Sequence, residues 1–169
     1  MQSEQATVLP RYGDVGVRGM QMRAVGIDLG SKRIGVSLSD SAGTLATPYE
    51  VVQRSGDRQR DHRALKELVD EAEAEIVVVG LPLSLDGSDG PQAKKYRAEA
   101  KVIAKVVGIA VVVHDERFTT VTAEQTLKDA NLDGRRRRQV IDKVAAAVML
   151  QDWLDGRRDH SEGQQTDGS

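Results

Sequence analysis

The stretch from Arg23 to Asp40, RAVGIDLGSKRIGVSLSD, constrains the fold more than any other part of the chain. It predicts an apolar strand that ends in an acid, Asp28, a turn over 30–32, and a second strand over 33–39 with alternating apolar residues. A charged residue in a core strand lowers the free energy of unfolding by several kcal/mol unless it is paired, hydrated or bound to metal. The sequence therefore predicts a β-hairpin in which Asp28 is either a ligand or a turn-capping residue.

The rest of the chain predicts an α/β fold around this hairpin. Pro48 cannot donate to a sheet, so it places the third strand at an edge. Unalternating β-branched runs after two helices are typical of parallel strands covered on both faces. After the hairpin, strands are expected over 44–52, 75–80 and 109–113. Helices are expected over 58–74, over 91–107, from Thr119 or Thr120 to about 130, and over 136–154. The predicted fold is ribonuclease-H-like, with a mixed five-stranded sheet of order 3-2-1-4-5 flanked by helices.

The size and composition of the chain indicate one domain. With 169 residues and 39% hydrophobic content, we expect one ribonuclease-H-like domain over 22–154, a flexible extension over 1–21 and a disordered tail over 155–169. The chain has no cysteine, no bilayer-length apolar run and no leader in its first twenty residues, which predicts a cytoplasmic protein. A net charge of −2 argues against wholesale coating of nucleic acid but allows a local basic surface.

Three acids lie at the end of an element or inside an apolar one: Asp28, Glu116 and Asp142. The carboxyl ends of parallel strands are where ligands gather in an open sheet, and both Asp28 and Glu116 are expected there. Grouped carboxylates repel one another, and hard divalent cations such as Mg²⁺ or Mn²⁺ remove that conflict. The three acids therefore predict a metal site.

Each of these acids also has a structural interpretation. Glu116 could pair with Arg117 or Lys143, and Asp142 could be a first-turn acid favoured by the helix dipole. Asp115 competes with Glu116 as the ligand. The fifth strand is expected two spacings, about 9.6 Å, from the first, so only a loop that curls back would bring Glu116 to the site.

Basic residues surround the acids in the sequence. Lys32 and Arg33 lie in the first turn, Lys94 and Lys95 at a helix start, and the run 135–138 just before the last acid. Cations around an acidic centre suit a phosphodiester held over a metal, although a charge run is also typical of a solvated helix start. With 3% aromatic residues there is no platform for stacking bases. His62 and His114 have no partners at zinc-site spacing and are interpreted as structural.

Four stretches together resemble the RuvX/YqgF family of Holliday-junction-resolvase-like nucleases, over about residues 23–154: GIDLGSKRIGVSLSD (26–40), IVVVGLPLSLDGSDGPQA (76–93), DERFTTVTAEQTL (115–127) and IDKVAAAVMLQDWL (141–154). The resemblance implies a metal-dependent phosphodiesterase with Asp28, Glu116 and Asp142 as catalytic metal ligands. It also implies maturation of pre-16S ribosomal RNA at its 5′ end. The positions expected to contact nucleic acid are Lys32, Arg33, Arg117, Thr119, Thr120, Arg135, Arg136, Arg137, Arg138 and Lys143.

The expected function is therefore that of a nuclease, a hydrolase acting on ester bonds with Mg²⁺ or Mn²⁺. Its expected partners are pre-rRNA or branched DNA and ribosomal precursor particles, with no membrane, and the chain is expected to be a monomer or a homodimer. Three alternatives stay open: a resolvase of branched DNA, a non-catalytic RNA-binding module in ribosome assembly, and an actin-like nucleotidase. The last is disfavoured because one chain of 169 residues lacks a second lobe to close over ATP.

Overall fold

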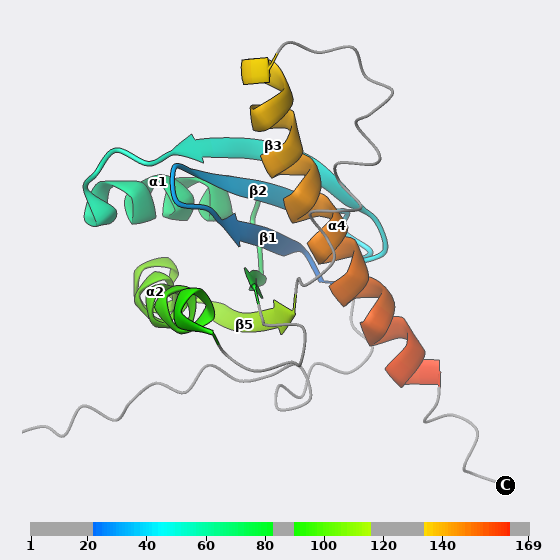
Figure 1. Cartoon of the computed structure of the whole chain (residues 1–169). Coiled ribbons are helices and arrows are strands. Elements are labelled where there is room, and N and C mark those ends of the chain that lie inside the picture. Colours follow the sequence, from blue (N-terminus) through cyan, green and yellow to red (C-terminus); the bar gives the residue numbers. More distant parts are fainter. Residues whose placement is uncertain (1–21, 83–89, 116–133, 163–169) are drawn as a thin grey trace, which may run out of the picture.

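The computed structural model describes residues 22–82, 90–115 and 134–162, without the side chains of 135 and 160–162 (Figure 1). The elements are β1 (Ala24–Leu29), β2 (Arg33–Ser39), β3 (Ala46–Gln53), α1 (Arg58–Glu71), β4 (Ile76–Leu81), α2 (Pro91–Val107), β5 (Ala110–Asp115) and α4 (Gly134–Glu162). No helix among these is long and apolar enough to cross a membrane. The predicted extension over 1–21 and the predicted helix ending near 130 lie outside the described residues.

The five strands form one mixed sheet in the order β3-β2-β1-β4-β5. β1 pairs antiparallel with β2 and parallel with β4, β2 pairs antiparallel with β3, and β4 pairs parallel with β5. This arrangement confirms the predicted strand order. Asp28, near the end of β1, lies between Gly35 of β2 and Gly80 of β4.

Helices cover both faces of the sheet (Figure 1). On one face, α1 and α2 bury Leu65, Val69, Tyr96 and Ile103 against Val25, Ile27 and Leu29. On the other, α4 crosses the strands and buries Met149, Leu150 and Trp153 against Ile76 and Val78. Since successive side chains of a strand point to opposite faces, Ala24, Gly26 and Asp28 face α4.

Small residues of the hairpin let α4 approach the sheet closely. A Cβ built on Gly35 would lie 2.1 Å from the carbonyl oxygen of Asp142, and one on Gly26 would lie 2.9 Å from Cβ of Leu150. The Ser37 hydroxyl donates to the carbonyl oxygen of Ala146 at 2.8 Å. The helix backbone therefore rests directly on the hairpin.

The last helix is longer than the sequence predicts. α4 begins at Gly134 rather than at residue 136 and continues to Glu162 rather than ending at Leu154. The tail expected to be disordered from residue 155 is thus helical as far as it is described. Arg157 lies over the Trp153 ring, 5.3 Å from its centroid, and Asp155 pairs with Arg158, so side-chain contacts continue the helix past Gly156.

We expect Gly35→Ala to lower the free energy of unfolding by about 2 kcal/mol, because the added methyl group must displace the α4 backbone. Gly156→Ala, a change within α4 itself, is the control. A Cβ there meets nothing within 4 Å, so this change should stabilise the protein by about 0.5 kcal/mol. Urea unfolding of both variants measures the difference, and equal stability of the two would contradict the close packing of α4.

Candidate active site

Two of the three predicted acids lie close together on the α4 face of the sheet. Asp28 faces α4 from β1, and its neighbour across the β1–β2 pair is Gly35. The backbone of Asp142 packs on that same glycine. The alternative of Asp142 as a first-turn acid is wrong, because α4 starts about two turns earlier and its first turn contains no acid.

Asp28 lies in a row of residues that crosses the sheet. Its neighbours on the two flanking strands are Gly35 and Gly80, and His114 of β5 continues the row. Carboxylate oxygens are the ligands that Mg²⁺ and Mn²⁺ prefer. The donor atoms of Asp28 and Asp142 therefore fit a divalent cation.

Within the described ranges, no group of three His, Cys, Asp or Glu side chains comes together to hold a metal. The third predicted ligand, Glu116, lies outside them, as do Arg117, Thr119 and Thr120. Asp115, the alternative to Glu116 as the third ligand, lies within the described residues. In β5, Val111 and Val113 pack on the α1 and α2 side, so alternation directs Asp115 to that side and away from Asp28.

Asp142 forms an ion pair with Arg33 at the start of β2. The distance from Arg33 Nε to Asp142 Oδ2 is 2.5 Å, and the two side chains are 23% and 26% exposed. The pair joins the hairpin to the helix above it. It also places a fixed positive charge beside a candidate metal ligand.

Arg33 also lines a pocket of about 250 Å³, together with Lys32, Gln53, Arg138 and Gln139. We call these five residues the basic pocket. It contains three cationic side chains and two amides, with no acid among its lining residues. Such a composition suits a phosphate group, because Lys and Arg supply charge and donors while amides add hydrogen bonds.

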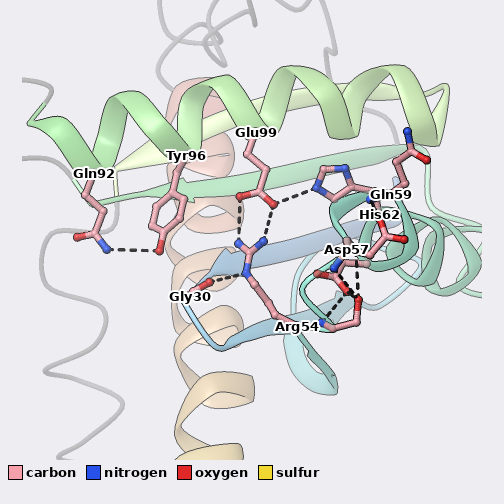
Figure 2. Close-up of polar contacts among 10 residues, drawn as sticks. Gly30, Arg54, Asp57, Gln59, His62, Gln92, Tyr96 and Glu99 are labelled. Atoms are coloured by element: carbon pink, nitrogen blue, oxygen red, sulfur yellow. Dashed lines mark hydrogen bonds and ion pairs between the residues drawn. The ribbon is translucent and has the colours of Figure 1, made fainter.

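A buried ion-pair network fixes the turn that carries the cations of this pocket. Arg54 donates from Nε to the carbonyl oxygen of Gly30 at 2.8 Å and from its backbone N to that of Lys32 at 2.9 Å. Its two terminal nitrogens donate to both oxygens of Glu99, at 2.7 and 3.0 Å. His62 Nε2 lies 2.9 Å from Glu99 Oε1 (Figure 2). The turn is thus tied to α1 and α2 on the far side of the sheet.

The Glu99 carboxylate is fully buried. Burial acts to raise its pKa, but the hydrogen bonds and positive charges of Arg54 and His62 outweigh burial, so the pKa of Glu99 lies below its usual value. The Arg54 guanidinium has a raised pKa because of the hydrogen bond to Glu99. Both groups therefore stay charged at neutral pH.

A hydrogen bond between His114 and Asp152 ties the end of β5 to α4. His114 Nε2 lies 2.7 Å from Asp152 Oδ2.

Lys143 of α4 is half-buried, while Arg136, Arg137 and Arg138 are exposed near the start of this helix. The described part of the predicted basic surface therefore lies along the first turns of α4 and the β1–β2 turn.

Similarity to known proteins shows the family of this chain. A family model described as "RuvX: Holliday junction resolvase" matches residues 22–156. The chain belongs to the RuvX family. Similar proteins include relatives that carry the name "Putative pre-16S rRNA nuclease". The one from Myxococcus xanthus is 45% identical over 137 residues, covering 81% of this chain and 90% of the relative. The one from Moorella thermoacetica is 48% identical over 134 residues, covering 79% and 95%.

Among solved structures, Thermus thermophilus RuvC in complex with a Holliday junction substrate shares the fold, with a TM-score of 0.50 and 19% identity. The alignment covers 81% of this chain and 96% of RuvC. The predicted ribonuclease-H-like fold and the predicted family of this RuvX member are therefore confirmed. Its assignment to the nuclease class of hydrolases is confirmed by the family and by the names of its relatives.

Sequence reasoning missed several polar residues of this RuvX-family site. Gln53 and Gln139 line the basic pocket, and Arg54 and Glu99 fix its turn. His62, which the sequence predicts to be a structural histidine, is buried and contacts Glu99. Glu99 carried a signal, since it lies three residues after Tyr96 and four before Ile103 and so on the apolar face of its helix. Gln53, Gln139 and Arg54 carried none, because an isolated polar residue at the end of a strand or start of a helix is commonplace.

We expect Glu99→Gln to lower the free energy of unfolding by about 3 kcal/mol at neutral pH, because it leaves the Arg54 charge without its buried partner. Since the pKa of Glu99 is lowered in the folded state, its contribution is complete above the unfolded pKa of about 4.3 and is lost as pH falls below it. The difference between variant and wild type should therefore shrink below that pH.

Urea unfolding across this pH range measures the effect. Asp70→Asn is the matched control, because it breaks the exposed Lys66–Asp70 pair of α1 and should cost less than about 1 kcal/mol. A Glu99 variant no less stable than this control would contradict the role of the network.

Proposed function

We propose that this chain is a metal-dependent nuclease in which Asp28, Asp142 and Glu116 hold Mg²⁺ or Mn²⁺. The observation that supports it most is the placement of Asp28 and Asp142 on one face of the sheet, meeting at Gly35. Asp28 is a half-buried carboxylate on a central strand, and a second acid on the same face of the sheet adds like-charge repulsion that a shared cation would relieve. Two bound cations would activate a water and stabilise the leaving oxygen of the phosphodiester.

The protein's own residues would bind and orient the nucleic acid. The basic pocket lies beside Asp142, through Arg33, so a phosphate in the pocket would hold the strand next to the acids. The Arg54 contacts to Gly30 and Lys32 keep this turn in place while the strand is bound. The further contacts proposed from the sequence are Arg117, Thr119, Thr120, Arg135, Arg136, Arg137 and Lys143.

We propose pre-16S ribosomal RNA, at its 5′ end, as the substrate, within ribosomal precursor particles. The names of relatives at 43% to 48% identity support this choice. A second candidate is branched DNA, which the description of the family model favours. Phosphate contacts carry no base information and a metal site of this kind acts on DNA or RNA, so the site chemistry suits both.

The decisive experiment incubates pure protein with labelled precursor rRNA and with four-way DNA junctions, each in Mn²⁺, Mg²⁺ or EDTA. Cleavage of the precursor near the 16S 5′ end, abolished by EDTA, is the expected result. Binding of RNA without cleavage, unchanged by EDTA, would instead make the chain a non-catalytic assembly module. Cleavage of junctions alone would make it a resolvase.

We expect Asp28→Asn to lower the cleavage rate by at least about a hundredfold, because it removes one ligand charge with almost no change in volume. Asp70→Asn, an exposed acid of α1 on the opposite face, serves as the control and should cleave normally. The measurement is the single-turnover rate at saturating Mn²⁺, with circular dichroism to verify folding. Full activity in folded Asp28→Asn would disprove the metal role.

We expect Lys32→Gln and Arg138→Gln to weaken nucleic-acid binding about equally for all sequences, and each to reduce the slope of log affinity against log salt by about 1. Lys105→Gln, an exposed lysine in the last turn of α2, is the matched control and should change neither. Fluorescence anisotropy over a range of salt concentrations, with EDTA present, measures both quantities. An altered sequence preference with an unchanged salt slope would contradict backbone binding by the pocket.

A further inference from the structure

We propose that Arg33 couples the two halves of this site, so that a phosphate bound in the basic pocket strengthens divalent-cation binding at Asp142. The inference rests on the proposed function, since it takes Asp142 as a metal ligand. It adds a regulatory step, because the metal would bind tightly only when a nucleic-acid backbone occupies the pocket.

The guanidinium of Arg33 belongs to both places. Its Nε donates to Asp142 Oδ2 at 2.5 Å, and the same side chain lines the basic pocket. A guanidinium has five N–H donors in a rigid plane, so it can face a carboxylate on one side and a phosphate on another. Lys32 and Arg138 line the same pocket, but within the described part of the chain only Arg33 pairs with Asp142.

In the absence of substrate, this ion pair opposes metal binding. The positive charge of Arg33 neutralises the carboxylate that a cation needs and repels the cation itself. Because both side chains are about three-quarters buried, water screens this repulsion only in part. The free protein should therefore bind a divalent cation more weakly than is usual for a site with two or more carboxylates.

A phosphate in the pocket reverses this balance. It offers the guanidinium an alternative anionic partner and cancels its charge near Asp142. The backbone of the turn is held by Arg54 through Gly30 and Lys32, so the response is confined to the side chain. Coupling between two ligands is reciprocal, so the cation must strengthen phosphate binding by the same factor.

The first test measures Mn²⁺ binding by titration calorimetry without nucleic acid. Arg33→Gln should bind Mn²⁺ about tenfold more tightly than wild type, because it removes a unit charge beside the ligand. Lys32→Gln and Arg138→Gln are the matched controls. They lose a pocket cation that does not contact Asp142 and should change the affinity by less than about twofold.

The second test compares wild type with Arg33→Gln in the presence of an added anion. Inorganic sulfate is used as a tetrahedral anion, and it should tighten Mn²⁺ binding several-fold in wild type and have no such effect in Arg33→Gln. Mn²⁺ affinity that is unchanged or weaker in Arg33→Gln, or unaffected by sulfate in wild type, would overturn the coupling.

Asp28→Asn separates this failure from failure of the proposed function. If wild type binds Mn²⁺ and Asp28→Asn does not, the metal site stands whatever Arg33 does. If wild type binds no Mn²⁺ even with sulfate present, or Asp28→Asn binds it equally well, the metal site and the coupling are both wrong.

Discussion

The close approach of α4 to the β1–β2 hairpin is the contact on which the site depends. It is possible only because Gly26 and Gly35 present no side chains to the helix and Ser37 offers a hydroxyl that bonds its backbone. At a larger separation between helix and sheet, Asp142 would lie farther from the strand that carries Asp28. The glycines thus do more than allow tight packing, because they bring the backbone of Asp142 onto the strand neighbour of Asp28.

The opposite face of the sheet supports the same site through charge. Arg54, Glu99 and His62 form a buried network among α1, α2 and the end of β3, and Arg54 reaches through to the β1–β2 turn. An arginine suits this position, because its planar fork can hold Glu99 with two nitrogens and the Gly30 carbonyl with the third. The turn that carries Lys32 and Arg33 is therefore fixed by residues that never face the substrate.

Charge in this protein is arranged locally, so a net charge of −2 conveys little about it. Asp28 faces α4 and Asp142 lies on it, while cations gather at the adjoining pocket, with the Arg33–Asp142 pair at the boundary. A site that holds a phosphodiester over a divalent cation needs cationic and acidic side chains next to each other. The cationic side chains attract the phosphodiester, and the acidic ones retain the metal. The same boundary is where binding of the strand and of the metal can influence one another.

The sequence by itself determined the sheet order and the candidate acids. Period-two alternation, β-branched runs and Pro48 are local signals, and Asp28 stands out because a carboxylate is costly in an apolar strand. The length of α4 was missed, because its last turns are polar and depend on contacts such as that of Arg157 with Trp153. Only the tertiary structure decided that Arg33 pairs with Asp142 and that Arg54 reaches Glu99. These pairs are 109 and 45 residues apart, and no local pattern encodes a contact created by packing a helix or an edge strand onto the rest of the sheet.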